Sequence, residues 1–124
     1  MIIPEIAKWA QKKSIGLMAT GDWTHPLWNK ELKASLEEDG SGLLELRIKK
    51  QELRSKRDCD IASPKFLLSG EVSCIYTQGG KGRRIHTLIF APDFATVDKI
   101  NAELTKRGCN LMSDGRPIIG LTSI

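Results

Sequence analysis

FLLSGEVSCIY (residues 66–76) and IHTLIF (residues 85–90) are two runs with the β-branched and aromatic side chains typical of strands. Between them, QGGKGR at residues 78–83 is rich in glycine, which favours a tight turn. We therefore predict a β-hairpin whose two strands are neighbours in one sheet.

A helix, a strand and a second helix are predicted before the hairpin. Residues 4–13 predict a helix that begins at a proline and has apolar side chains at three- and four-residue spacing, namely Ile6, Trp9 and Ala10. The apolar run at residues 17–20 predicts a parallel strand covered on both faces. Residues 27–38 predict the second helix, which DGSG at residues 39–42 would end. Strand, loop and helix form a βα unit.

After the hairpin, Asp93 is expected to cap a helix that reaches Arg107 and ends at Gly108. A short apolar strand is expected at the end of the chain, near residue 118. The highly charged residues 47–60 are interpreted as a solvated helix or a mobile insertion. The sequence thus predicts an α/β fold in a single domain over residues 1–124.

Length and composition indicate which class of protein this chain belongs to. The chain has 124 residues, 40% of them hydrophobic and 27% charged, which is typical of a globular domain but short for an α/β barrel of about 200 residues or more. A net charge of +4 is compatible with a phosphate-bearing partner without requiring one. Three widely spaced cysteines and the lack of a signal-like segment favour a reducing compartment, so we expect a soluble cytoplasmic protein without a membrane partner.

Four residues are candidates for chemistry: Asp22, His25, Glu71 and His86. Their imidazoles and carboxylates suit zinc, manganese or iron, which generate a hydroxide nucleophile near neutral pH. Each also has a simpler interpretation. The histidines are consistent with hydrogen-bonded structural residues, Glu71 with a solvent-facing ion pair, and Asp22 with a turn cap.

Lys81, Arg83 and Arg84 in the glycine-rich turn are candidate phosphate ligands, although a solvated hairpin tip explains them equally well. Trp23 and Trp28 flank His25, where they would either stack on a nucleic-acid base or pack in the core.

Several separated motifs, taken in order, resemble the endonuclease Q family of PHP (polymerase and histidinol phosphatase) enzymes. The motifs are IAKWA (residues 6–10), ATGDWTHPLW (19–28), LLSGEVS (67–73), RRIHTLIFAP (83–92), INAEL (100–104) and SDGRPI (113–118).

The resemblance implies a partial PHP-type (β/α)7 barrel, incomplete at both ends, and divalent metal ions such as zinc, manganese or magnesium. It implies hydrolysis of DNA on the 5′ side of deaminated bases, such as uracil and hypoxanthine, or of abasic sites. His25, Glu71 and His86 would then be metal ligands, Glu71 and Asp22 would be catalytic, and DNA containing deaminated bases would be the partner.

The sequence also departs from the family pattern, because it has only two histidines and lacks the His-x-His motif of the first PHP strand. About a third of the family's length is present, so we expect an open sheet that needs the missing barrel segments or self-associates through its strand edges. The isolated chain is predicted to be inactive or nearly so. The alternatives are a non-catalytic module that binds nucleic acid or protein, and a phosphatase acting on a small phosphate ester.

Overall fold

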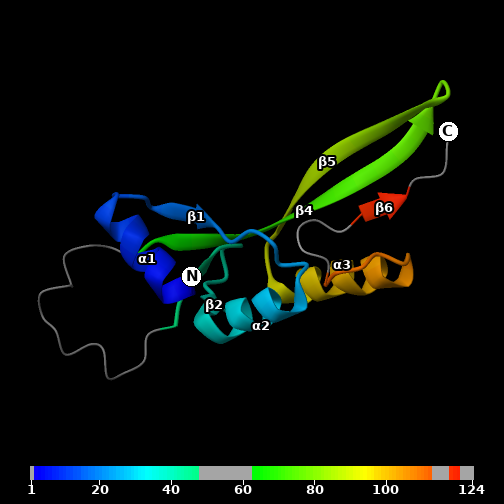
Figure 1. Cartoon of the computed structure of the whole chain (residues 1–124). Helices are drawn as coiled ribbons and strands as arrows, with labels where there is room; N and C mark the ends of the chain where they lie inside the picture. Colours follow the sequence, from blue (N-terminus) through cyan, green and yellow to red (C-terminus); the bar gives the residue numbers. More distant parts are fainter. Residues whose placement is uncertain (1, 48–62, 113–117, 121–124) are drawn as a thin grey trace, which may run out of the picture.

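The computed structural model of the chain describes residues 2–47, 63–112 and 118–120. Figure 1 shows how the helices and strands are arranged. In order, the elements are α1 (Ile3–Lys12), β1 (Leu17–Ala19), α2 (Pro26–Ser35), β2 (Leu36–Glu38), β3 (Leu44–Leu46), β4 (Lys65–Gln78), β5 (Lys81–Ala91), α3 (Phe94–Lys106) and β6 (Ile118–Gly120).

The long strand β4 joins the whole six-stranded sheet. Its first residues pair with β1 in parallel on one edge and with β3 on the other, and β3 continues into an antiparallel pair with β2. Its remaining residues pair with β5 in antiparallel register and with β6 in parallel. β4 therefore links two smaller sheets, one at each end.

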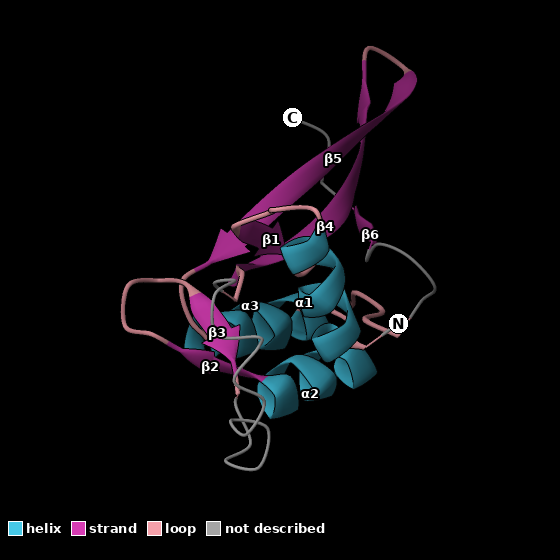
Figure 2. Cartoon of the chain, turned by 90° about the vertical axis from the view of Figure 1, so that its left-hand side faces the viewer, coloured by secondary structure: helices cyan, strands magenta, loops and turns pink. Residues whose placement is uncertain are grey.

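The helices lie beside β4, and the β4–β5 hairpin extends well beyond them (Figures 1 and 2). The main core forms where α1, α2 and α3 meet the first half of β4, and its buried members are Ile3, Ala7, Trp23, Leu32, Leu36, Leu44, Phe66, Leu68, Ala91 and Val97. A smaller cluster of Val72, Leu104 and Cys109 continues the packing along β4. Burial raises the pKa of the Cys109 thiol.

The predicted hairpin and the helix after it are confirmed. β4 and β5 pair from Leu68↔Ala91 to Gln78↔Lys81, and Gly79 and Gly80 between them have φ of 59° and 74°. Two consecutive positive φ values are what a two-residue hairpin turn requires, and glycine adopts them without strain. The Asp93 carboxylate accepts a hydrogen bond from the Thr96 backbone N–H and so caps α3.

The second predicted helix is too long. It ends at Ser35, and the backbone becomes extended at Leu36 so that β2 can pair with β3, a strand that the sequence did not predict. Residues 39–42, expected to end the helix, instead form the connection between β2 and β3. There the Asp39 N–H donates to the Leu43 carbonyl. Burial of Leu36 outweighs helical periodicity, because this side chain reaches the core from a strand.

Two expectations about burial were wrong. β1 is a parallel strand as predicted, but Leu17 is 50% exposed, so the strand is not covered on both faces. In α1, Trp9 does not join the core and lies 55% exposed, with the Lys12 ammonium 4.7 Å from its ring centroid. Ala10 of the predicted apolar face is buried, together with Ile3 and Ala7, and Ile6 packs against the core.

The terminal strand is confirmed as β6, whereas most of the charged segment at residues 47–60 lies outside the described residues. No described helix is long and apolar enough to cross a membrane. A mixed α/β fold is thus confirmed, and the partial barrel stays a prediction.

Replacing Gly70 by alanine should destabilise the fold, because the added Cβ would lie 2.8 Å from Cε2 of the buried Trp23. Overpacking of this kind costs about 1–3 kcal/mol of the free energy of unfolding, which urea denaturation would measure. Gly82→Ala is the matched control on β5, since a Cβ there meets nothing within 4 Å. Equal stability of the two variants would contradict the close packing of Trp23 on Gly70.

The cap of α3 predicts a pH dependence. The pKa of Asp93 is lowered from its ordinary value of 3.8, first by the hydrogen bond from the Thr96 backbone and then by the Thr96 side chain. A carboxyl group with a depressed folded-state pKa stabilises the fold above its unfolded-state pKa, and this contribution is lost as the pH falls through the folded-state value. Asp93→Ala should therefore be less stable than the wild type at neutral pH, with a difference that shrinks below about pH 4.

Urea denaturation at several pH values would measure this effect. Asp93→Asn is the control, because asparagine also caps helices but does not titrate. A difference between wild type and Asp93→Ala that stays constant down to low pH would contradict the role of the carboxylate.

Candidate functional site

Glu71 on β4 and His86 on β5 form the clearest chemical pair in the described structure. The strand register places Glu71 opposite Leu88 and Ser73 opposite His86, so Glu71 and His86 are diagonal neighbours on one face of the hairpin. The distance from Glu71 Oε1 to His86 Nδ1 is 3.1 Å, and the two side chains are 31% and 42% exposed. When Nδ1 carries the proton it donates to the carboxylate, and Nε2 keeps a lone pair for a ligand.

The face that carries this pair is opposite the helices. Side chains alternate along β4, so Leu68, Gly70 and Val72 face the buried clusters, whereas Glu71 faces the other way. On the same face of β5, Leu88 is 62% exposed. The carboxylate and imidazole are thus accessible and have an apolar neighbour.

The loop after β1 lies against β4 just before Glu71. The Gly21 N–H donates to Ser69 Oγ at 2.9 Å, and the Ser69 N–H donates to Thr20 Oγ1 at 3.2 Å. Gly21 and Asp22 have φ of 67° and 40°, a left-handed conformation that aspartate tolerates better than most residues. Ser69 precedes Glu71 by two positions on the same face of β4, so this loop borders the pair.

The predicted residues of this loop have different surroundings. Asp22 is exposed, and its carbonyl accepts the His25 N–H at 2.9 Å. His25 is half-buried and immediately precedes α2, where its carbonyl accepts the Asn29 N–H. The backbone of Asp22 thus takes part in the turn before α2, and both interpretations of its side chain stay predictions.

Of the two alternatives for the tryptophans, core packing holds for Trp23, which is fully buried. Its carbonyl accepts hydrogen bonds from Asn29 Nδ2 at 2.9 Å and from Asn101 Nδ2 at 3.2 Å. Trp28 is half-buried, and its Nε1–H donates to the Gly21 carbonyl at 3.0 Å. The two asparagines were missed by sequence reasoning, because a polar side chain on a helix carries no signal of a buried carbonyl partner.

The structure brings together only part of the predicted metal set. Glu71 and His86 are in contact, and within residues 2–47 and 63–112 no three His, Cys, Asp or Glu side chains form a group that would hold a metal ion. A catalytic zinc site uses three protein ligands, so the donor types of the pair fit a divalent metal but their number does not complete a site. The metal roles of His25, Glu71 and His86 stay predictions.

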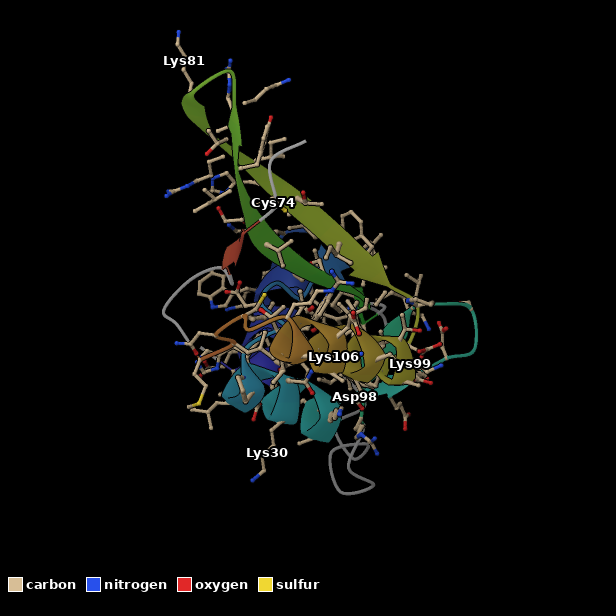
Figure 3. All side chains as sticks on the ribbon, turned by 90° about the vertical axis from the view of Figure 1, so that its right-hand side faces the viewer. Lys30, Cys74, Lys81, Asp98, Lys99 and Lys106 are labelled. Carbon is tan, nitrogen blue, oxygen red and sulfur yellow. The ribbon has the colours of Figure 1, made fainter. Side chains whose placement is uncertain are left out.

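The predicted phosphate ligands lie apart from this pair, toward the outer end of the hairpin. Lys81, Arg83 and Arg84 are all exposed, and Figure 3 shows Lys81 at the tip, far from the helices.

Comparison with known structures matches almost the whole chain to one enzyme. The crystal structure of endonuclease Q in complex with a 27-mer duplex substrate that has an abasic lesion at the active site is 30% identical in sequence, with a TM-score of 0.69. The lesion-specific endonuclease Q of Pyrococcus furiosus is 25% identical, with a TM-score of 0.67. The chain is similar to endonuclease Q in both sequence and fold. This confirms the resemblance inferred from the separated motifs.

The similarity covers 98% of this chain but 25% of either endonuclease Q chain, somewhat less than the third that was expected. The chain therefore spans about a quarter of the length of these structures. No family model matches it, and no curated protein is detectably similar.

Ser69→Ala should destabilise the protein by about 1–3 kcal/mol, because it removes the acceptor of the Gly21 N–H at a buried position. Ser73→Ala is a matched control two residues along the strand: this serine is also buried, but its Oγ has no hydrogen-bond partner in the described structure. We expect the control to be neutral or slightly stabilising in urea denaturation. Equal free energies of unfolding for the two alanine variants would mean that the hydrogen bond from the Gly21 N–H to Ser69 does not stabilise the protein.

Proposed function

We propose that this chain provides part of the active site of a metal-dependent DNA repair endonuclease, which hydrolyses a phosphodiester on the 5′ side of a deaminated base or an abasic site. The observation that carries the proposal is the contact between Glu71 and His86 on the open face of a hairpin. It is supported by the similarity to a lesion-specific endonuclease and to endonuclease Q bound to an abasic duplex.

Within this function, Glu71 and His86 would hold one side of a divalent metal ion. Carboxylate and imidazole are donors that zinc and manganese accept. Such an ion lowers the pKa of bound water and neutralises phosphoryl oxygens. The side chains are partly exposed, so a phosphodiester can approach them. Asp22, exposed in the loop that borders Glu71, is proposed as a second catalytic carboxylate.

A non-catalytic DNA-binding module is the second candidate. It is favoured by the incomplete set of ligands among the described residues, since a catalytic zinc site uses three protein ligands and Glu71 and His86 supply two. Metal binding separates the two candidates.

Elemental analysis of the purified chain, after incubation with zinc or manganese and desalting, tests the proposal directly. We expect bound metal in the wild type and at least tenfold weaker binding in Glu71→Gln and in His86→Ala, because each removes a donor. Glu37→Gln, which alters an exposed carboxylate on β2, is the matched control and should keep the metal. Adding His25→Ala tests whether the histidine before α2 belongs to the same site.

A chimera tests the reaction. In it, this chain replaces the matching quarter of Pyrococcus furiosus endonuclease Q, and the substrate is a duplex with one abasic site. Lesion-dependent nicking that is lost in Glu71→Gln but kept in Glu37→Gln would support the nuclease. A metal-free wild-type chain together with a Glu71→Gln chimera as active as the wild-type chimera would reject it.

A further inference from the structure

The outer part of the β4–β5 hairpin, residues 76–84, is a two-stranded ribbon, here called the ribbon tip. β6 pairs with β4 only as far as Ile75, and β5 is the only described strand that pairs with β4 beyond it. Every residue from Thr77 to Leu88 is exposed. Figures 1 and 2 show the ribbon tip extending past the helices and β6.

Charge is distributed unevenly along this hairpin. Between Glu71 and Asp93 the sequence has no aspartate or glutamate, but it has three cations, Lys81, Arg83 and Arg84. None of the three has an ion-pair partner in the part of the chain that the structure describes. Elsewhere lysines do pair with carboxylates, as Lys33 does with Asp98 at 2.7 Å. The ribbon tip is therefore a purely cationic projection.

The register divides these cations between the two faces of the ribbon. Arg83 lies opposite Tyr76 on one face, and Lys81 opposite Gln78 on the same face. Arg84 lies opposite Ile75 on the other face. Since side chains alternate along a strand, Arg84 shares that face with His86 two residues away. A ligand that contacts Arg84 would thus extend toward the pair of Glu71 and His86.

The dimensions of the ribbon tip fit one groove of duplex DNA. Paired strands are about 4.8 Å apart, and with side chains on both faces such a ribbon enters the major groove, about 12 Å wide, but not the minor groove of about 6 Å. Strands rise about 3.4 Å per residue, so the three steps from Ile75 to Gln78 span roughly 10 Å, comparable to the groove depth of about 8.5 Å. Gly79 and Gly80 at the end have no side chain to keep the backbone away from the bases.

We propose that the ribbon tip binds duplex DNA by entering its major groove, with Lys81, Arg83 and Arg84 contacting phosphates on the groove walls. This rests on the proposed function in taking DNA as the substrate, and it adds an anchoring surface separate from the metal-binding pair. Contacts with phosphates position a protein on DNA without reading its sequence. The ribbon tip would thus hold the duplex so that one strand passes the Glu71–His86 face.

Fluorescence anisotropy with a labelled, lesion-free duplex in EDTA tests this surface, because neither a lesion nor a metal is then needed. The test variant combines Lys81→Ala, Arg83→Ala and Arg84→Ala in the full chain. The matched control combines Lys30→Ala, Lys99→Ala and Lys106→Ala, which remove the same charge from exposed lysines of α2 and α3, far from Lys81 in Figure 3. Circular dichroism and urea midpoints verify that both variants are folded.

We expect the test variant to bind duplex at least about tenfold more weakly than the wild type, and the control to lose much less. The slope of log K against log salt concentration should fall by about one for each side chain that contacts a phosphate. The wild type should also prefer the duplex to a single strand of equal length, and methyl green, a major-groove ligand, should compete with it.

Equal losses in the two triple variants, no preference for duplex, or no binding by the wild type at low salt would each overturn the proposal. If the triple substitution at the tip impairs folding, the single variants Arg83→Ala and Arg84→Ala replace it, each expected to lower the salt slope by about one. The metal analysis of Glu71→Gln is independent of this experiment. A negative DNA-binding result for the ribbon tip would therefore not contradict the nuclease proposal. A negative metal analysis would not contradict DNA binding by the ribbon tip.

Discussion

The packing of Trp23 on Gly70 is the contact on which the rest of the structure depends. The indole lies so close to β4 that no side chain fits at position 70, and it fills the centre of the core between the sheet and the helices. Asn29 of α2 and Asn101 of α3 both donate to the Trp23 carbonyl, so one residue orients two helices relative to one strand. Without this contact, α2 and α3 would lose the residue that holds both of them against β4.

The same contact explains why the two faces of β4 differ. Trp23, Leu104 and Cys109 cover the core face of β4, and the opposite face keeps Glu71 accessible. Ser69 belongs to that opposite face but is used to attach the loop after β1 through the Gly21 N–H. The strand that organises the core therefore also brings the Asp22 loop next to the candidate site.

The length of β4 is a second constraint on the structure. This strand extends beyond the region that the helices cover. Its outer residues have β5 as their described pairing partner, and cations are the only charged side chains on this part of the hairpin. The hairpin thus combines a polar pair near the body with a basic projection farther out. The register of this hairpin places Arg84 on the same face as Glu71 and His86, and Lys81 and Arg83 on the opposite face.

Local sequence signals were sufficient for several elements. Gly79 and Gly80 determined the hairpin, since their positive φ values are accessible to glycine without strain, and Asp93 determined the start of α3 through its side-chain cap. The order of motifs was also sufficient to identify the similarity to endonuclease Q. Residue chemistry selected Asp22, His25, Glu71 and His86 as candidates, and the resemblance to endonuclease Q supplied their expected roles.

Tertiary structure decided the remainder, because it depends on partners distant in the sequence. Leu36 leaves its predicted helix because a strand pairing with Leu46 buries it, and Trp9 stays exposed because Ile3, Ala7 and Ala10 meet the core first. Glu71 and His86 meet only because the register of β4 and β5 makes them diagonal neighbours. The sequence by itself thus determined which residues have suitable chemistry and where the chain turns, whereas only strand pairing and burial decided which of these residues come into contact.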